Sequence, residues 1–198
     1  MVGIMTMELL LILGMAVLAF GHATIQDSGI VTIIDFRSEP PGGWYEVNDG
    51  VMGGRSSSSM RPTGEGSAVF EGNLSLENNG GFASVRAEVP EGALAEFSRL
   101  VIRVRGDGKR YQMRLRMSSA FDGIAYRASF ETTANEWTTV EIPFSAFEPS
   151  FRGYRPRDAE PLDAARVRQV GFMLTDGQEG RFRLEIAWIG AERTEVRS

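Results

Sequence analysis

The sequence that decides the fold is LVIRVRGDGKRYQMRLRM, residues 100–117. Apolar side chains occupy every second position over residues 100–104 and again over residues 111–117, with arginine, glutamine or valine between them. Such strict alternation predicts two β-strands, each buried on one face. The Gly-Asp-Gly sequence at residues 106–108 is typical of a hairpin turn. We therefore expect the two strands to be antiparallel neighbours.

The rest of the chain predicts more strands of this kind. Runs of β-branched and aromatic residues are separated by Gly, Asn, Asp and Pro, with little helical periodicity. We predict strands over residues 31–36, 67–70, 81–89, 124–131, 137–142, 167–174 and 181–189, a tight corner or short helical turn over 143–147, and a long loop over 152–163. A total of roughly nine to eleven strands favours an all-β sandwich or jelly roll over residues 30–192.

Three tryptophans are expected in the core of this sandwich. Trp44, Trp137 and Trp188 each stand within an apolar pattern, so burial is a better explanation for them than an exposed sugar platform. Trp188 also continues the alternating apolar run that begins at Phe182.

The first 23 residues differ from the rest of the chain. Residues 9–20 form a stretch of twelve residues without a polar or charged side chain, which is short for a membrane span of roughly 20 residues. Gly21 and Ala23 then occupy the −3 and −1 positions of a cleavage site. We expect a cleaved signal peptide over residues 1–23, a linker over 24–29 and an exported, periplasmic or extracellular protein without stable membrane insertion. An uncleaved N-terminal membrane anchor is the alternative.

Composition excludes several classes of site. The chain has no cysteine, and its one histidine, His22, lies in the expected leader. Zinc sites of Cys and His, cysteine nucleophiles and a Ser–His–Asp triad are therefore not expected. The formal net charge of −5 disfavours general nucleic-acid binding. The phosphate-loop and dinucleotide glycine patterns are absent as well, and we expect no cofactor.

Two segments are more specific than a generic sandwich. They read WYEVNDGVMGGRS at residues 44–56 and FEGNLSLENNGGFASVR at residues 70–86. Together they closely resemble the complex I intermediate-associated protein 30 family, and the resemblance covers about residues 33–190. It implies a galactose-binding-like β-sandwich. It also implies the role for which the family is known in eukaryotes, that of a non-catalytic, chaperone-like factor in the assembly of mitochondrial respiratory complex I. Bacterial members occur as stand-alone proteins.

Two polar loops within these segments are candidate binding sites. The first contains Asn48, Asp49 and Arg55, and the second contains Glu77 with Asn78 and Asn79. The Asn, Asp and Gly residues are also typical of sharp turns, because they tolerate left-handed backbone and bond to their own main chain. The consecutive carboxylate and amide oxygens suit sugar hydroxyls or Ca²⁺. A single such cluster lacks the 6–8 oxygens that Ca²⁺ takes, so no metal site is predicted.

Arginines on alternate positions form a second candidate surface. If residues 100–117 make a hairpin, Arg103, Arg105, Arg114 and Arg116 share one sheet face. This face is either a solvated surface that blocks edge aggregation or, together with Arg86, an anion- or carboxylate-binding surface.

The sequence predicts a binding protein rather than an enzyme. We expect a non-catalytic, assembly-factor-like module that binds a protein partner, with an exported carbohydrate-binding module as the alternative. A hydrolase built on paired carboxylates would have Asp49 and Glu77 as candidates, but nothing in their spacing supports the pairing. The expected partner- or ligand-binding residues are those of the two polar loops, with Arg86, Arg114 and Arg116.

Overall fold

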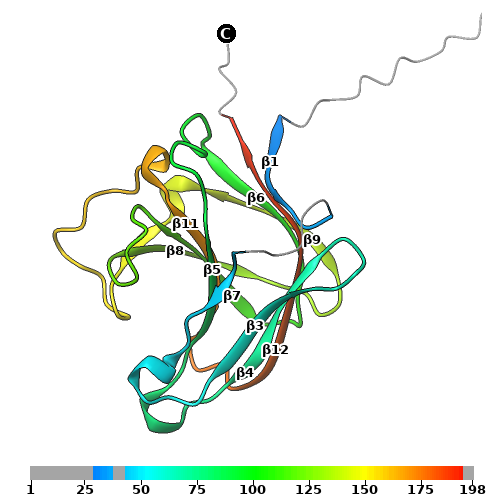
Figure 1. The fold of residues 1–198 in the computed structure, drawn as a ribbon, viewed down its shortest axis with the longest axis vertical. Helices are drawn as coiled ribbons and strands as arrows, with labels where there is room; N and C mark the ends of the chain where they lie inside the picture. The colour runs from blue at the N-terminus through cyan, green and yellow to red at the C-terminus, as the bar shows by residue number, and fades with distance from the viewer. Residues whose placement is uncertain (1–28, 38–42, 194–198) are drawn as a thin grey trace, which may run out of the picture.

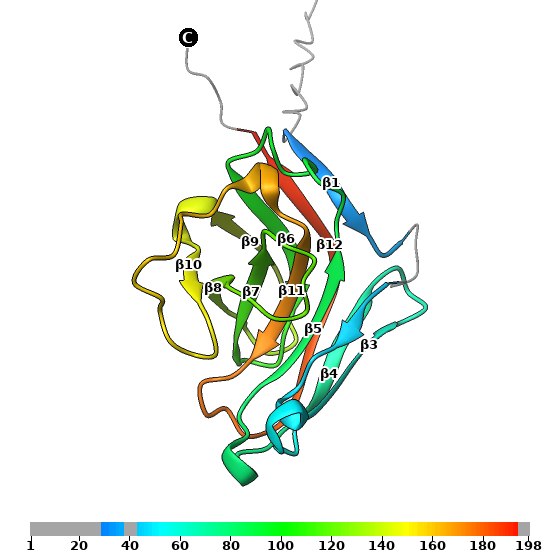
Figure 2. The ribbon, with the colours of Figure 1, turned by 60° about the vertical axis from the view of Figure 1, so that its left-hand side comes forward.

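The computed structural model describes residues 29–37 and 43–193, which form two antiparallel six-stranded sheets packed face to face (Figures 1 and 2). Sheet A has the order β3-β4-β12-β6-β9, with β1 also paired to β12. Its strands are β1 (Ile30–Asp35), β3 (Ser57–Pro62), β4 (Ala68–Leu74), β6 (Arg99–Arg105), β9 (Trp137–Pro143) and β12 (Gly180–Glu192). Because Ile30 pairs with Glu192, the two ends of the domain lie side by side (Figure 1).

Sheet B has the order β10-β8-β7-β11-β5-β2. Its strands are β2 (Tyr45–Glu46), β5 (Ala83–Glu88), β7 (Arg110–Arg116), β8 (Ala125–Glu131), β10 (Glu148–Ser150) and β11 (Gln169–Leu174). Four single-turn 3₁₀ helices lie in the connections: η1 (Asp49–Met52), η2 (Glu77–Asn79), η3 (Phe144–Ala146) and η4 (Ala164–Arg166). The all-β sandwich expected from the sequence is confirmed. The strands that sequence reasoning missed are β2, β3 and β10.

The predicted hairpin over residues 100–117 is wrong. Strand β6 pairs with β12 and β9 in sheet A, whereas β7 pairs with β11 and β8 in sheet B. The turn between them crosses from one sheet to the other and is anchored by Asp107, whose carboxylate accepts hydrogen bonds from the Tyr111 hydroxyl (2.9 Å) and the Arg183 amide (3.0 Å). Alternation specifies which face of a strand is buried, but it does not specify the neighbouring strand.

The two alternating stretches nevertheless supply the centre of the core. Leu100, Ile102 and Val104 point inward from sheet A, and Tyr111 and Met113 point inward from sheet B, all of them fully buried. Aromatic contacts join the two layers, because Tyr111 of sheet B meets both Phe70 and Phe182 of sheet A at centroid distances of 6.4 Å. Burial of these large side chains between two sheets is the main driving force for the fold.

Only one of the three tryptophans packs against the core. Trp44 stacks on Phe172 of β11 at a centroid distance of 6.1 Å. Trp137 lies on the outer face of sheet A beneath Arg105, so its expected core position is wrong. Trp188 is also displaced from the core, because a β-bulge after Ile186 shifts the register.

The predicted leader and nearly all of the predicted linker fall within residues 1–28, which lie outside the described residues. Within residues 29–37 and 43–193, no helix has the length and apolar character needed to cross a membrane.

Candidate functional site

The first polar loop is organised around the Asp49 carboxylate, which is completely buried. Its Oδ1 accepts a hydrogen bond from the Ser56 amide (2.9 Å). Its Oδ2 accepts from the Ser56 hydroxyl (2.5 Å) and from the amides of Gly81 (2.7 Å) and Phe82 (3.3 Å). The carboxylate therefore binds the protein's own main chain from both motif segments and is not presented to solvent.

Asn48, the residue before Asp49, also links segments that are far apart in the sequence. Its side-chain oxygen accepts from the Ser58 hydroxyl of β3 (2.7 Å) and from the Ser84 amide of β5 (3.1 Å), so it bridges the two sheets. Two glycines allow the close packing. A Cβ on Gly54 would collide with the Asp49 side chain, and one on Gly80 would lie 2.7 Å from Asp49 Oδ2. We use the name Asp49 knot for the cluster of Asn48, Asp49, Ser56, Ser58 and Ser84.

Burial alone would raise the pKa of Asp49. Hydrogen bonds from the Ser56 side chain and from the amides of Gly81, Ser56 and Phe82 outweigh that effect and hold the pKa below its ordinary value. The carboxylate is thus charged in the folded protein, and its charge is neutralised by donors rather than by a cation.

The second polar loop is exposed. Glu77, Asn78 and Asn79 form η2, with Asn78 and Asn79 in the left-handed region at φ of 55° and 60°. Glu77 forms an exposed ion pair with Arg55 (2.8 Å), which links the rims of the two loops. Among the described residues no group of three or more Asp, Glu, His or Cys side chains could hold a metal ion.

The remaining predicted site residues meet on the outer face of sheet B. Strand register sets Arg127 of β8 opposite Arg114 of β7, Arg114 opposite Gly171 of β11, and Gly171 opposite Arg86 of β5. Tyr45 of β2 continues this row beyond Arg86. Gly171 has no side chain, and a Cβ there would collide with a backbone carbonyl of β5, so the centre of the row stays open.

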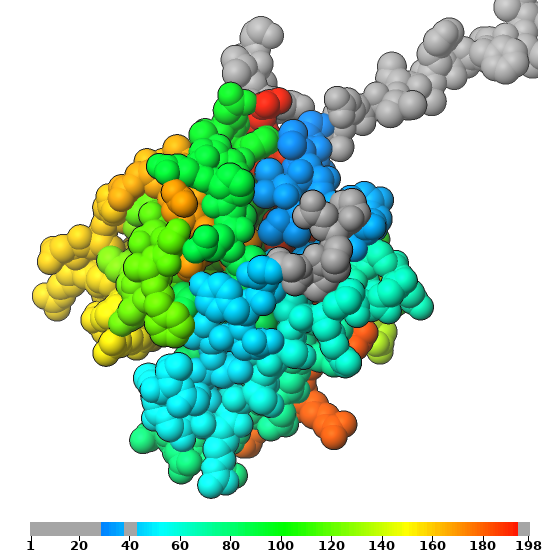
Figure 3. Space-filling view, viewed as in Figure 1, coloured from blue at the N-terminus to red at the C-terminus, as the bar shows by residue number. Residues whose placement is uncertain are grey.

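This row is the floor of a groove of about 600 Å³, which we call the arginine groove. Its floor consists of Arg86, Arg114, Arg116 and Arg127 with Gln112 and Gln169. Val51, Met52 and Phe121 stand at its rim and are 65%, 59% and 61% exposed. In the space-filling view, the loop around residue 120 (light green) and the segment around residues 45–52 (cyan) lie on the same face (Figure 3).

The Arg86 guanidinium is held in place without a carboxylate. Its Nη2 donates to the Phe121 carbonyl (3.0 Å), and its Cζ lies 5.1 Å from the centroid of the Tyr45 ring and 4.8 Å from that of the Phe121 ring. Cation–π contacts on two rings fix the planar group more firmly than one would. Its Nε is buried without a hydrogen-bond partner, and so is Oε1 of Gln169.

Arg114 and Arg116 also lie close to other positively charged side chains. Burial, together with the charges of Arg116, Arg127 and Arg86, lowers the pKa of Arg114 to about 10. Burial and the charge of Arg86 also lower the pKa of Arg116, although the negative charge of Asp122 opposes them. Arg116 donates to the Gly123 carbonyl (2.9 Å). Within the described part of the chain, none of the four floor arginines has a carboxylate within ion-pair distance.

Arg103 and Arg105, which the expected hairpin would align with Arg114, lie instead on the outer face of sheet A. Arg105 pairs with Glu185 (2.8 Å), and Arg103 donates to the Thr139 hydroxyl (2.9 Å). Sequence reasoning also missed Arg127, Gln112 and Gln169 of the groove. Arg127 alternates correctly within its strand, but only the register of β8 against β7 brings it to Arg114.

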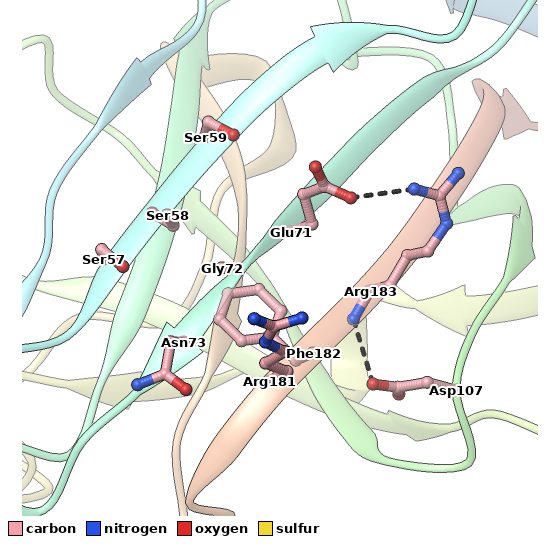
Figure 4. A pocket seen from close by; sticks show the side chains of 10 residues that line it. All are labelled: Ser57, Ser58, Ser59, Glu71, Gly72, Asn73, Asp107, Arg181, Phe182 and Arg183. Atoms are coloured by element: carbon pink, nitrogen blue, oxygen red, sulfur yellow. Dashed lines mark hydrogen bonds and ion pairs between the residues drawn. The ribbon is translucent and has the colours of Figure 1, made fainter.

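A second, shallower pocket of about 670 Å³ lies on sheet A (Figure 4). Its two acidic residues, Glu71 and Asp107, balance its two arginines, Arg181 and Arg183, and all of these except Arg181 form hydrogen bonds or ion pairs with their neighbours. Arg183 pairs with Glu71 (2.8 Å), and the Arg183 amide donates to Asp107 (3.0 Å). A site whose charges already compensate one another gains little from an added charged ligand. The arginine groove is therefore the better candidate.

Comparison with known proteins gives both relatives and fold neighbours. Residues 34–186 match the family model described as complex I intermediate-associated protein 30. The mitochondrial protein of that name from Mus musculus is 31% identical over 168 residues, 74% of this chain and 51% of that protein. The Drosophila melanogaster protein is 27% identical over 174 residues, 75% of this chain and 58% of that protein. The chain thus spans about half the length of the curated relatives it matches.

Among solved structures, the family 11 carbohydrate-binding module of the cellulase Lic26A-Cel5E of Clostridium thermocellum aligns with a TM-score of 0.65 at 19% identity, covering 86% of this chain and 98% of that chain. A structure of the family 11 module from the same organism in complex with a β-1,3-1,4-mixed-linked tetrasaccharide aligns with a TM-score of 0.60 at 18% identity, covering 81% and 95%. At such identity the likeness shows the fold alone.

The exported localisation expected from the sequence is wrong. The relatives from Mus musculus, Drosophila melanogaster and Caenorhabditis elegans are named as mitochondrial proteins, which conflicts with a periplasmic or extracellular destination. The export prediction rested on the apolar stretch of residues 9–20 and the small residues after it. No Lys or Arg precedes that stretch, although a positive n-region is part of a secretory signal.

Replacing the buried carboxylate tests the Asp49 knot. In Asp49→Asn, an amide replaces one carboxylate oxygen and turns donors toward the N–H and O–H groups that now bind it. We expect the free energy of unfolding, measured by urea denaturation, to fall by about 2–3 kcal/mol.

Glu77→Gln, at the exposed carboxylate of the second polar loop, is the control and should change the free energy of unfolding by less than about 0.5 kcal/mol. Since the folded-state pKa of Asp49 is lowered, its ionisation stabilises the protein above about pH 4 and ceases to do so as the pH falls below that value. The gap between wild type and Asp49→Asn should therefore narrow in acid. Equal stability of the two proteins at neutral pH would contradict the knot.

Removing one floor cation should stabilise the protein. Arg114→Met keeps an unbranched side chain next to Met173 but removes a partly buried charge that faces three other arginines. We expect the free energy of unfolding to rise by about 1–2 kcal/mol, because the cost of burying the charge disappears. The matched variant Arg103→Met, on the outer face of sheet A, should be nearly neutral. A destabilised Arg114→Met would show that the arginine serves the fold.

Proposed function

The chain belongs to the complex I intermediate-associated protein 30 family, and we propose that it acts as a non-catalytic, assembly-factor-like module that binds a protein partner in the arginine groove. The observation that carries the proposal is a groove with four arginines on its floor, none paired with a carboxylate of the described residues, and exposed apolar side chains on its rim. Fixed cations and apolar groups together are typical of protein-recognition surfaces.

The carboxylates offer little to support a catalytic role. Asp49, one of the two acids considered for hydrolysis, uses both oxygens to bind main-chain and serine donors of its own loops. Glu77, the other, is exposed and pairs with Arg55. The two aspartates that line the groove, Asp122 and Asp176, pair with Arg152 (2.8 Å) and Arg110 (3.2 Å). A general acid or base needs a carboxylate that is free to exchange a proton with a substrate.

Carbohydrate binding is the second candidate. It is favoured by the alignment with the family 11 module, which covers 98% of that chain. The groove floor argues against a neutral glycan, because four guanidinium groups suit anionic ligands better than uncharged hydroxyls. The assembly-factor role accounts for both the relatives and the charge, so it is the better supported of the two.

Site-specific photo-crosslinking tests the proposal. A benzophenone amino acid at Phe121, on the groove rim, is expected to crosslink to a subunit of complex I in cells whose respiratory chain includes that complex. The same amino acid at Val31, which is 41% exposed on β1 of sheet A, is the matched control and should give no such product.

Crosslinks to complex I subunits from Val31 but not from Phe121 would move the partner site to the other sheet. If neither position captures such a subunit, while calorimetry detects binding of the β-1,3-1,4-mixed-linked tetrasaccharide, carbohydrate binding replaces the assembly proposal.

A further inference from the structure

We infer that the arginine groove binds an extended acidic segment of a partner protein, whose carboxylates lie along the row formed by Arg127, Arg114 and Arg86. This inference rests on the proposed function and adds the chemistry of the bound segment. The observations that carry it are the charge of the groove, the way its arginines are held, and the spacing of the row.

The charge of the groove opposes that of the chain. Five arginines and two aspartates line it, although the whole chain has a formal net charge of −5. Both aspartates are engaged by arginines outside the floor. The carboxylate opposite Arg127 on the neighbouring strand, Glu148, pairs with Arg155 (3.4 Å). The floor charges are thus left for a ligand from outside.

Two buried polar atoms on the floor, one a donor and the other an acceptor, also lack partners. Arg86 and Gln169 are 6% and 1% exposed, yet Arg86 Nε and Gln169 Oε1 have no hydrogen-bond partner. Each such atom costs about 1–3 kcal/mol when left unpaired. Native proteins keep few of these atoms, and two of them next to a cluster of unpaired cations indicate a surface selected for binding rather than for stability.

The arginines are held ready for the ligand. Arg86 lies between the Tyr45 and Phe121 rings, and Arg116 is tied to the Gly123 carbonyl. Arg114 donates to Gln112 Oε1 (3.2 Å) on its own strand. Side chains that are already ordered lose less conformational entropy when they bind, so more of the interaction energy appears as affinity.

The spacing of the row suits an extended chain. Neighbouring strands lie about 4.8 Å apart, so Arg127, Arg114 and Arg86 span about 14 Å, with the gap at Gly171 between the last two. Side chains on one face of an extended segment recur about every 7 Å. The span of about 14 Å equals two such repeats, so a segment that crosses the strands can place carboxylates at Arg127 and Arg86 with a third between them near Arg114, while its alternate side chains face the rim.

The rim favours a protein segment over a small polyanion. Phe121, Met52 and Val51 are exposed apolar side chains at the edge of the groove, and they can contact apolar residues that alternate with the acidic ones. A free phosphate or polyphosphate would use the floor and leave this rim exposed. Charge complementarity would also make binding of the segment sensitive to salt.

Fluorescence anisotropy with a short labelled peptide of alternating glutamate and leucine tests the inference on the full chain. We expect saturable binding that weakens about tenfold or more when every glutamate is replaced by glutamine, or when the protein carries Arg114→Met. Arg103→Met removes the same charge from the other sheet and should bind as wild type does. Because Arg114→Met is expected to be the more stable protein, lost binding cannot be attributed to unfolding.

Two results would overturn the inference: equal binding by wild type and Arg114→Met, or equal binding of the glutamate and glutamine peptides. Tripolyphosphate is the competing probe. If it binds and the peptide does not, the groove is a phosphate site. If crosslinking at Phe121 captures a complex I subunit equally well in Arg114→Met, the proposed function stands and the acidic-segment inference fails. If the peptide binds as expected but no complex I subunit is captured, only the proposed function fails.

Discussion

The rest of the structure depends on the hydrogen bonds that converge on the buried Asp49 carboxylate. A carboxylate in the interior is tolerated only when donors neutralise it, and here the donors come from both motif segments of the chain. Asn48 extends the same network across the two sheets through Ser58 and Ser84. Because η1 begins at Asp49, the knot also places Val51 and Met52 at one end of the arginine groove. The polar loop around Asp49, which the sequence suggests as a binding site, thus helps to position one end of the arginine groove.

The charges of the arginine groove are compensated far less completely than the charge of Asp49. In the Asp49 knot a single buried charge receives all the hydrogen bonds that it needs. On the outer face of sheet B, four guanidinium groups accumulate with carbonyl, ring and amide contacts but with no paired carboxylate among the described residues. Burial and mutual repulsion lower the pKa of Arg114 to about 10, which means that the fold bears a cost for its charge. Such a cost is characteristic of surfaces selected for binding.

Part of the fold and of the candidate site follows from sequence alone, and the rest depends on which strands are neighbours. Alternation correctly places Tyr111 and Met113 in the core, and the motif segments lead to the correct fold family. Alternation cannot say that β6 and β7 belong to different sheets, so it groups Arg103 with Arg114 and overlooks Arg127. Turn chemistry likewise predicts a loop at residues 48–50 but not the burial of Asp49, because its partners stand up to 33 residues away. Strand β3, rich in serine, has no apolar alternation to reveal it.

The central claim is that this domain takes its ligand on the outer face of sheet B. The most direct test is to follow backbone amide chemical shifts of the full chain by NMR as the acidic peptide is added. Binding there would give concentration-dependent shifts confined to β5, β7, β8 and β11 and to the rim around Val51, Met52 and Phe121, largest around Arg86, Arg114 and Gly171. Shifts confined to the sheet A pocket around Glu71 and Arg183, or no shifts with saturating peptide, would contradict the central claim.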